Sequence, residues 1–256
     1  MQFNKEAGRN QRLVASSHAG VSRRQAILEA LSIEANHKII DIGCGAGYLV
    51  EDLAKALGDQ GRVYALDPSE DQLGEARIRC SSFSNVTFFN SSADNIALGD
   101  NACDIVTSTQ AYEYVKDIDK ALAESTRVLK PGGAFVNVSI LWDYFRFHGA
   151  EEKLNNLIHD AFRAHCYHQM LPLELEGKLR ALEYQYITHK SLAFLITRRD
   201  QNSPARHLET MVASFAVSQG VLTSEVEEWR RQLTDAEARG RFGFTSYPVL
   251  TSAYLK

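Results

Sequence analysis

The sequence contains few cysteines, and none lies at a spacing that binds metal or builds a disulfide framework. Cys44, Cys80, Cys103 and Cys166 are scattered through 256 residues without a C-x-x-C pair. Zinc sites and disulfide-rich secreted domains both depend on closely spaced cysteines. We therefore expect reduced thiols, no metal site and a cytoplasmic protein.

Long apolar runs and an excess of positive charge are also missing. No apolar run reaches the roughly 18 residues of a membrane-spanning helix, and residues 1–20 lack the apolar centre of a signal peptide. The formal net charge is −4, so the composition offers no general basic surface for DNA, RNA or an anionic membrane. We predict one domain over residues 1–256, a monomer or homodimer that binds no nucleic acid and spans no membrane.

Strand-like and helix-like segments alternate from Lys38 to Leu141. Short apolar runs are separated by segments with apolar residues at helical spacing. Strands joined by helices of this length form a parallel sheet through right-handed crossovers, with helices on both faces. The predicted strands cover 38–43, 62–67, 86–91 and 104–109, residues 131–141 are predicted to turn into a fifth strand, and the predicted helices cover 48–57, 69–80 and 117–129.

The pattern changes after Trp142. Residues 144–183 are predicted to be mostly helical, and one strand each is predicted over 183–197 and 241–256. Two more helices are expected between these strands. Ser203 is placed to cap the first, with Pro204 in its first turn, and Ser224 and Glu227 have capping-box spacing in the second. The fold class expected from this pattern is α/β.

The first predicted strand leads into the first helix through three glycines at alternate positions. Gly43, Gly45 and Gly47 allow a close approach of a ligand to the backbone, and the following helix offers free N–H groups. Ligands of doubly wound sheets bind at the carboxyl ends of the strands, where this loop lies. A dinucleotide loop would need glycine where Tyr48 stands, and a phosphate-binding loop would need a Gly-Lys pair. Asp41 repels phosphate and attracts an ammonium group, so the sequence favours a ligand with a positive end.

Two more acidic residues follow the second and third predicted strands. Asp67, about 20 residues beyond the loop, is placed to accept both hydroxyls of a ribose. Asp94, in SSADNIAL, can accept the exocyclic amine of an adenine. Together these features outline S-adenosylmethionine. The alternative is that both acids only cap helices, as Asp often does.

Five segments resemble the motifs of class I S-adenosylmethionine-dependent methyltransferases. IIDIGCGAG, ALDPS, SSADNIAL, DIVTSTQAYEYV and RVLKPGGAF occur in that order, and the chain is most similar to the ubiquinone/menaquinone-biosynthesis type, the methyltransferase type 11 domain. The resemblance implies a Rossmann-like, doubly wound, mainly parallel seven-stranded sheet with an antiparallel last strand and helical cap insertions. It also implies an N-terminal helical segment (1–37), a cofactor-binding core (38–141), and acceptor-side helices and last strands (142–256).

The resemblance implies an activity and a cofactor site. The methyl group of S-adenosylmethionine would pass to an O, N or C atom of a small molecule, leaving S-adenosylhomocysteine. The cofactor-binding residues implied are Asp41, Gly43, Cys44, Gly45 and Gly47 at the methionine moiety, Asp67 and Pro68 at the ribose, Ala93, Asp94 and Asn95 at the adenine, and Thr109 and Gln110 near the sulfonium.

Four residues are candidates for catalysis. Methyl transfer is an in-line displacement at an activated sulfonium, so positioning achieves much, and a base is needed only if the acceptor must lose a proton. Tyr112 and Glu113 follow the fourth strand, and Asp143 and His148 follow the fifth. Half-buried packing for Tyr112 and a helix start for Glu113 are the structural alternatives. Many relatives have a histidine pair after the fourth strand, but this chain reads AYEYV.

Two other functions stay open. A protein of this fold can bind S-adenosylmethionine and catalyse cyclisation, decarboxylation or a similar reaction, and the missing histidine pair favours this alternative. The other alternative is an enzyme that modifies a macromolecule, or an adaptor that binds a protein through the late helices. The negative net charge argues against RNA as the macromolecule.

Overall fold

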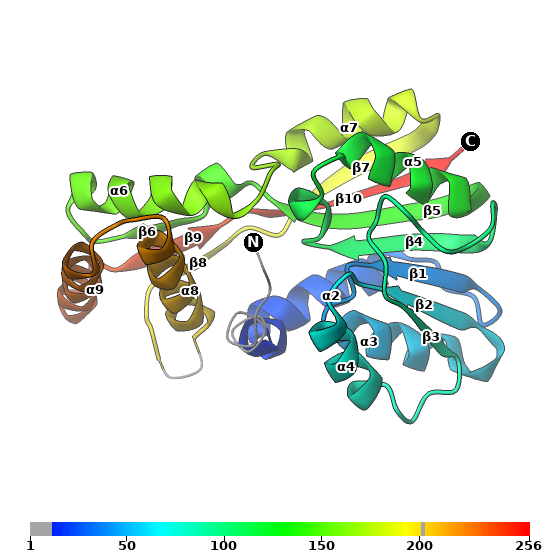
Figure 1. Cartoon of the computed structure of the whole chain (residues 1–256), viewed down its shortest axis with the longest axis horizontal. Coiled ribbons are helices and arrows are strands. Elements are labelled where there is room, and N and C mark those ends of the chain that lie inside the picture. The colour runs from blue at the N-terminus through cyan, green and yellow to red at the C-terminus, as the bar shows by residue number, and fades with distance from the viewer. Residues whose placement is uncertain (1–11, 201–202) are drawn as a thin grey trace. The chain divides into compact units, whose positions relative to one another are not determined.

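The computed structural model describes residues 12–200 and 203–256, which form two compact units (Figure 1). The larger unit contains residues 22–139, 171–191 and 249–256. The smaller unit contains residues 140–170, 192–248 and the described residues before Ser22. Two later segments, 171–191 and 249–256, thus belong to the same unit as residues 22–139.

A seven-stranded sheet forms the larger unit, in the order β3-β2-β1-β4-β5-β10-β7 (Figure 1). Strands β1 to β5 pair in parallel, whereas β10 pairs antiparallel with β7. The predicted mainly parallel sheet with an antiparallel last strand is confirmed. The strands are β1 (Lys38–Ile42), β2 (Arg62–Leu66), β3 (Val86–Phe89), β4 (Cys103–Thr109), β5 (Leu129–Ile140), β7 (Tyr184–Ser191) and β10 (Pro248–Leu255).

Helices cover both faces of this sheet, with α5 and α7 on one face and α3 and α4 on the other (Figure 1). Ile40, Ile42 and Val106 are buried in one cluster with apolar residues of α5 and α7. The opposite face is covered by α3, whose buried leucines recur at helical spacing. The helices are α2 (His18–Ala30), α3 (Tyr48–Leu57), α4 (Glu70–Arg79), α5 (Ile118–Val128) and α7 (Leu171–Ala181), with short 3-10 turns η1 (Gly58–Gln60) and η2 (Tyr112–Tyr114).

The strand order places a switch point between β1 and β4. The chain runs outward from β1 through β2 to β3, and then returns to the other side of β1 with β4 and β5. Such a reversal leaves a crevice at the carboxyl ends of the two central strands. The glycine loop after β1 and the loop after β4 therefore both lie at the edge where ligands bind in this fold.

The smaller unit contains a three-stranded antiparallel sheet in the order β6-β9-β8. Trp229 donates a hydrogen bond to Asn155 (2.8 Å), whose amide donates to the backbone oxygen of Phe147 (2.8 Å). This chain of bonds joins α9 and α6 to β6 inside an aromatic core. The elements are β6 (Arg146–His148), β8 (Phe194–Ile196), β9 (Gly243–Ser246), α6 (Glu152–Phe162), α8 (Pro204–Ser218), α9 (Thr223–Ala238), η3 (Trp142–Tyr144) and η4 (Arg163–His165).

Two strand predictions in the second half are wrong, because residues 183–197 and 241–256 each form two strands that belong to different sheets. Residues 146–148 form a short strand inside the segment predicted to be mostly helical. The two breaks lie side by side, because the N–H of Leu192 donates to the oxygen of Pro248 (2.8 Å). Pro248 has no N–H for a ladder, so it suits the point where the chain passes between sheets.

Two predicted helix caps also differ. The hydroxyl of Ser203 donates to the oxygen of Arg198 (3.2 Å) and does not cap α8, although Pro204 is the first residue of that helix. Helix α9 begins at Thr223, and Glu225 accepts a hydrogen bond from the N–H of Leu222 (3.1 Å). The predicted capping box was therefore two residues too late. No helix of the described ranges is long and apolar enough to cross a membrane.

Candidate functional site

The glycine loop, residues 43–47, is held against the carboxyl end of β2. The N–H groups of Gly43 and Cys44 both donate to the oxygen of Leu66, at 2.8 and 2.9 Å. Gly43, Gly45 and Gly47 have φ values of +70°, +52° and +77°. These values lie in the region that glycine adopts without the steric strain of a side chain.

The three glycines differ in their surroundings. A Cβ atom on Gly43 would lie 2.2 Å from Cβ of Ala111, and one on Gly47 would lie 2.9 Å from Cβ of Ala76. A Cβ atom on Gly45 would meet nothing within 4 Å. Gly43 and Gly47 thus allow the loop to pack closely on its neighbours, while a Cβ atom at Gly45 would point into open space.

Asp67, directly after β2, fixes the middle of this loop. Its Oδ2 accepts a hydrogen bond from the N–H of Gly45 and its Oδ1 accepts one from Ser69, both at 2.9 Å. Each carboxylate oxygen retains a second lone pair that can accept a ligand hydroxyl. Asp67 is 8% exposed, and burial raises the pKa of its carboxyl above the usual range.

Asp41, in β1, is buried beneath the loop. Its side chain accepts a hydrogen bond from the hydroxyl of Thr107 (3.1 Å) on the neighbouring strand β4. Burial raises the pKa of Asp41 to about 7, the bond from Thr107 opposes this rise, and the charge of Asp67 adds to it. A cation beside Asp41 would favour its ionised form.

The residues after β4 lie at the same edge of the sheet as the glycine loop. The N–H of Gln110 donates to the oxygen of Val138 (2.7 Å) while Gln110 has a positive φ of 52°. Thr109 buries a hydroxyl that has no hydrogen-bond partner among the described residues. Ala111 lies directly against Gly43, so this loop and the glycine loop are in contact.

Arg23 is a residue of this region that sequence reasoning missed. Its guanidinium, on α2, bonds to the side-chain oxygen of Gln110, and the residue is only 7% exposed. Burial lowers the pKa of Arg23 to about 10, while the charge of Glu113 acts in the opposite direction. No spacing in the sequence links an arginine of an early helix to the end of β4, so nothing in the residue pattern could have found it.

The loop after β3 carries the predicted adenine residues. Ala93 is buried, Asp94 is half-buried and Asn95 is exposed. The N–H of Asn95 donates to the oxygen of Ser92 (3.1 Å), which closes a tight turn, and the hydroxyl of Ser92 bonds to Asp94. The ends of β2 and β3 are joined because the N–H of Asp67 donates to the oxygen of Phe89 (3.2 Å).

The four candidate catalytic residues are distributed over both units. Tyr112 is fully buried in the core with its hydroxyl 2.6 Å from that of Ser125, an arrangement that favours packing. Glu113 is also fully buried, and it interacts electrostatically with Arg23. In the smaller unit, Asp143 pairs with Arg163, and His148 lies 3.2 Å from the hydroxyl of Thr245.

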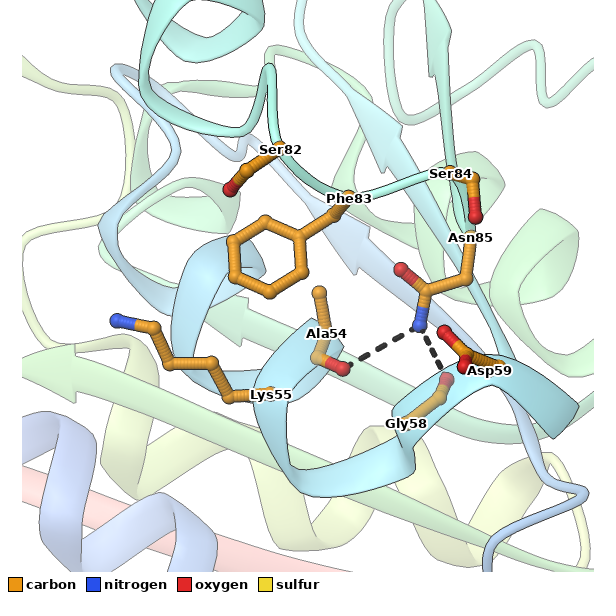
Figure 2. A pocket seen from close by; sticks show the side chains of 8 residues that line it. All are labelled: Ala54, Lys55, Gly58, Asp59, Ser82, Phe83, Ser84 and Asn85. Atoms are coloured by element: carbon orange, nitrogen blue, oxygen red, sulfur yellow. Dashed lines mark hydrogen bonds between the residues drawn. The ribbon is translucent and has the colours of Figure 1, made fainter.

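A separate hollow of about 270 Å³ lies at the opposite, amino-terminal edge of the strands (Figure 2). The amide of Asn85 donates there to the oxygens of Ala54 (3.3 Å) and Gly58 (2.7 Å), at the end of α3. Asn85 thus adds side-chain hydrogen bonds to carbonyl groups at the end of α3. Within residues 12–200 and 203–256, no group of three or more His, Cys, Asp or Glu side chains is arranged to hold a metal ion.

Comparison with known families finds a match over the region that contains the glycine loop. Residues 40–137 match the methyltransferase domain family, and this match spans the glycine loop, Asp67, Asp94 and the loop after β4. Residues 40–137 of this chain therefore belong to the methyltransferase domain family. The cofactor of this family is S-adenosylmethionine.

The relatives of this methyltransferase domain match over part of their length. A demethylmenaquinone methyltransferase of Staphylococcus epidermidis is 33% identical over 113 residues, which are 44% of this chain and 47% of the relative. The chain therefore spans about half the length of the curated relatives it matches.

Solved structures show the same fold. Phosphoethanolamine N-methyltransferase 2 of Haemonchus contortus, in complex with S-adenosylmethionine, aligns with a TM-score of 0.67 at 19% identity, over 100% of this chain and 58% of that chain. The (4+2)-cyclase SpnF aligns with a TM-score of 0.57 at 18% identity, over 94% of this chain and 85% of that chain. At these identities the alignments show the fold alone.

Proposed function

We propose that this protein transfers the methyl group of S-adenosylmethionine to an oxygen, nitrogen or carbon atom of a small molecule. The observation that carries the proposal is the hydrogen bond from the N–H of Gly45 to the carboxylate of Asp67. It joins the proposed ribose-binding acid to the one loop glycine whose Cβ direction is open. The relatives named as demethylmenaquinone methyltransferases support a small-molecule acceptor.

We assign the cofactor contacts by the chemistry of each part. Asp41 and the loop Gly43–Gly47 would hold the methionine end, where Asp41 complements the ammonium group. Asp67 and Pro68 would hold the ribose. The remaining contacts proposed are Ala93, Asp94 and Asn95 at the adenine, and Thr109 and Gln110 near the sulfonium.

Arg23 would add a contact to the carboxylate of the methionine end. Its guanidinium bonds to Gln110, which precedes the residue packed on Gly43. A planar guanidinium suits a carboxylate because it can donate two parallel hydrogen bonds. Arg23 and Asp41 would then match the two opposite charges of the same amino-acid group.

S-adenosylmethionine, when bound, supplies an activated methyl group that needs no covalent intermediate on the protein. The residues of this chain would bind it, orient it and exclude water, which is the main requirement of an in-line displacement. Glu113, which has a counter-charge in Arg23, is proposed to contact the acceptor. Asp143 and His148 remain candidates for catalysis within the smaller unit. Tyr112 is proposed to support the loop after β4 through its bond to Ser125.

The cellular location and the partners are proposed from composition and burial. Cys44, Cys80 and Cys103 are buried free thiols, which supports a cytoplasmic location. The net charge of −4 supports a small-molecule partner without nucleic acid. We propose that the working form is a monomer or a homodimer.

Calorimetric titration with S-adenosylhomocysteine tests the cofactor site. The wild type is expected to bind at micromolar strength, and Asp67→Ala is expected to weaken binding by at least about tenfold, or about 1.4 kcal/mol. Lys55→Ala, at the opposite edge of the strands, is the control and should bind like the wild type. A wild type that binds neither S-adenosylmethionine nor S-adenosylhomocysteine would contradict the proposal.

A second function keeps the cofactor but not methyl transfer. The cyclase SpnF shares the fold, and no histidine stands between Gln110 and Val115, after β4, to act as a base. In that case the bound cofactor would only shape the acceptor pocket. Formation of S-adenosylhomocysteine in a one-to-one ratio with product would support methyl transfer, and product formed without it would support the second function.

A further inference from the structure

The second half of the glycine loop is held by the last turn of α4. The guanidinium of Arg79 donates through Nε to the oxygen of Ala46 (2.9 Å). The same group lies over the ring of Tyr48, 3.5 Å from the ring centroid. Arg79 thus contacts the residues on both sides of Gly47 with one planar side chain.

These contacts complete the support of the loop along its length. The first half is fixed by β2, through the oxygen of Leu66 and the carboxylate of Asp67. The second half packs on α4, where Ala76 leaves no room for a side chain on Gly47. The position of Gly45, between the two halves, depends on both supports.

The contacts of Arg79 differ from those of an ordinary arginine at a helix end. Basic residues in a last helical turn often interact only with the carbonyl groups of their own helix. Arg77, in the same turn, pairs with Glu70 of its own helix at 2.5 Å and lies 5.7 Å from the ring centroid of Phe88. Arg79 instead reaches a backbone oxygen 33 residues away, in the loop itself.

The ring of Tyr48 also faces a second guanidinium, that of Arg24 on α2. The guanidinium of Arg24 lies 5.3 Å from the ring centroid of Tyr48, and its Nε is 2.8 Å from the carboxylate of Asp52 on α3. Cation–π contacts contribute roughly 0.5–2 kcal/mol, and more when they exclude water. The first turn of α3 is therefore held by α2 and α4 together.

We propose that Arg79 is a positioning residue for S-adenosylmethionine binding, which fixes residues 46–48 so that the backbone at Gly45 meets the ligand in one conformation. The contacts of Arg79 are with Ala46, Tyr48 and Glu51, the last an ion pair at 3.6 Å, and Arg79 acts on the loop through the first two. The consequence for affinity rests on the proposed cofactor site. The effect on the loop itself does not, and it can be measured without any ligand.

Amide hydrogen exchange of the ligand-free protein tests the effect on the loop. Arg79→Ala is expected to speed exchange of the amides of residues 45–48 by at least about tenfold, because opening the loop no longer breaks the contacts of Arg79. Arg77→Ala, in the same helical turn, should leave these amides unchanged. Equal exchange in Arg79→Ala and the wild type would overturn the inference, whether or not the protein binds S-adenosylmethionine.

Titration of the same variants with S-adenosylhomocysteine tests the effect on affinity. Arg79→Ala should raise Kd by about tenfold, Arg79→Lys should recover part of this loss because Lys can donate to Ala46 but cannot stack as a plane, and Arg77→Ala should stay within about twofold. Thermal unfolding of each variant separates this effect from a general loss of fold. A Kd for Arg79→Ala equal to that of the wild type would overturn the inference, whereas a wild type without affinity would overturn the proposed function.

Discussion

Three charged side chains at the carboxyl edge of the larger sheet are almost completely withdrawn from water. Arg23, Asp41 and Asp67 are 7%, 2% and 8% exposed. Charges are unfavourable in such places unless they are paired or hydrogen-bonded. Their partners are Gln110, Thr107 and the N–H groups of Gly45 and Ser69. The ammonium and the carboxylate of an amino-acid group would place an opposite charge beside Asp41 and Arg23, respectively.

Replacement of Arg23 should separate recognition of the amino-acid end from recognition of the nucleoside. Arg23→Ala is expected to weaken binding of S-adenosylhomocysteine by about tenfold, because the carboxylate loses a charged partner. Binding of methylthioadenosine, which has no amino-acid group, should change less than twofold. Asp67→Ala is the matched comparison and should weaken both ligands alike. Equal losses of both ligands in Arg23→Ala would contradict this assignment.

Protonation of Asp41 should make cofactor affinity depend on pH. The pKa of Asp41 is about 7 because the carboxyl is buried. An ammonium group binds the ionised form, so affinity for S-adenosylhomocysteine should rise by about tenfold from pH 6 to pH 8. Asp41→Asn keeps an acceptor for Thr107 but does not titrate, so its affinity should be lower and nearly constant over this range. Titrations at both pH values check this, and the same slope in both proteins would contradict it.

The glycine loop packs closely against the start of α3 and the last turns of α4. This packing decides which residues are tolerated there. Gly47 begins α3 in a left-handed conformation directly against Ala76 of α4. Gly74, two residues before Ala76 in α4, has nothing within 4 Å of the position that a Cβ atom would take. Close packing therefore requires glycine at position 47 but not at position 74, although the two residues belong to neighbouring helices.

Alanine at these two glycines should give opposite results. Gly47→Ala is expected to destabilise the fold by about 2 kcal/mol, from the left-handed backbone and the contact with Ala76, and to weaken S-adenosylhomocysteine binding. Gly74→Ala is expected to stabilise the protein by roughly 0.5–1 kcal/mol, because alanine favours a helix. Urea unfolding and calorimetry check both variants. A Gly47→Ala protein with unchanged stability would show that the loop shifts without strain.

Burial shifts the pKa values of ionisable groups in opposite directions in the two units. Burial raises the pKa of Asp41 in the larger unit. In the smaller unit, burial lowers the pKa of His159 to about 3 and of His165 to about 4. The two tryptophans of the chain, Trp142 and Trp229, both lie in the core of the smaller unit. Tryptophan fluorescence therefore reports the smaller unit alone.

Acid should unfold the smaller unit first. Below a pH of about 6.5 the unfolded chain protonates its histidines while buried His159 and His165 stay neutral, so stability falls as the pH drops toward 4. Neutral Asp41 shifts the larger unit the other way over the range between its ordinary pKa and about 7. Tryptophan fluorescence should change at a higher pH than circular dichroism, which reports both units.

His159→Gln is the matched variant for this prediction. The N–H of Phe147 donates to Nε2 of His159 (3.1 Å), and a glutamine oxygen can accept the same bond without titrating. The fluorescence transition of this variant should move to lower pH. A transition that stays in place would mean that His159 does not control the acid stability of the smaller unit.

Local patterns predicted much of the larger unit correctly. The strands and helices from Lys38 to Leu141 were predicted almost to the residue, because buried parallel strands and amphipathic helices have distinct apolar periods. Strands 183–197 and 241–256 were predicted without their breaks at Leu192 and Tyr247. Each of these segments remains strand-like throughout, so no local signal shows that it changes sheets.

The α/β class, the glycine loop and the acids Asp41, Asp67 and Asp94 could be predicted from the sequence, because each depends on neighbours along the chain. Which distant side chains join them depends on the tertiary fold. Arg23 reaches Gln110, Arg79 reaches Ala46, and Tyr112 turns into the core toward Ser125. These contacts join residues of different helices and loops, and their geometry follows from how the helices pack on the sheet.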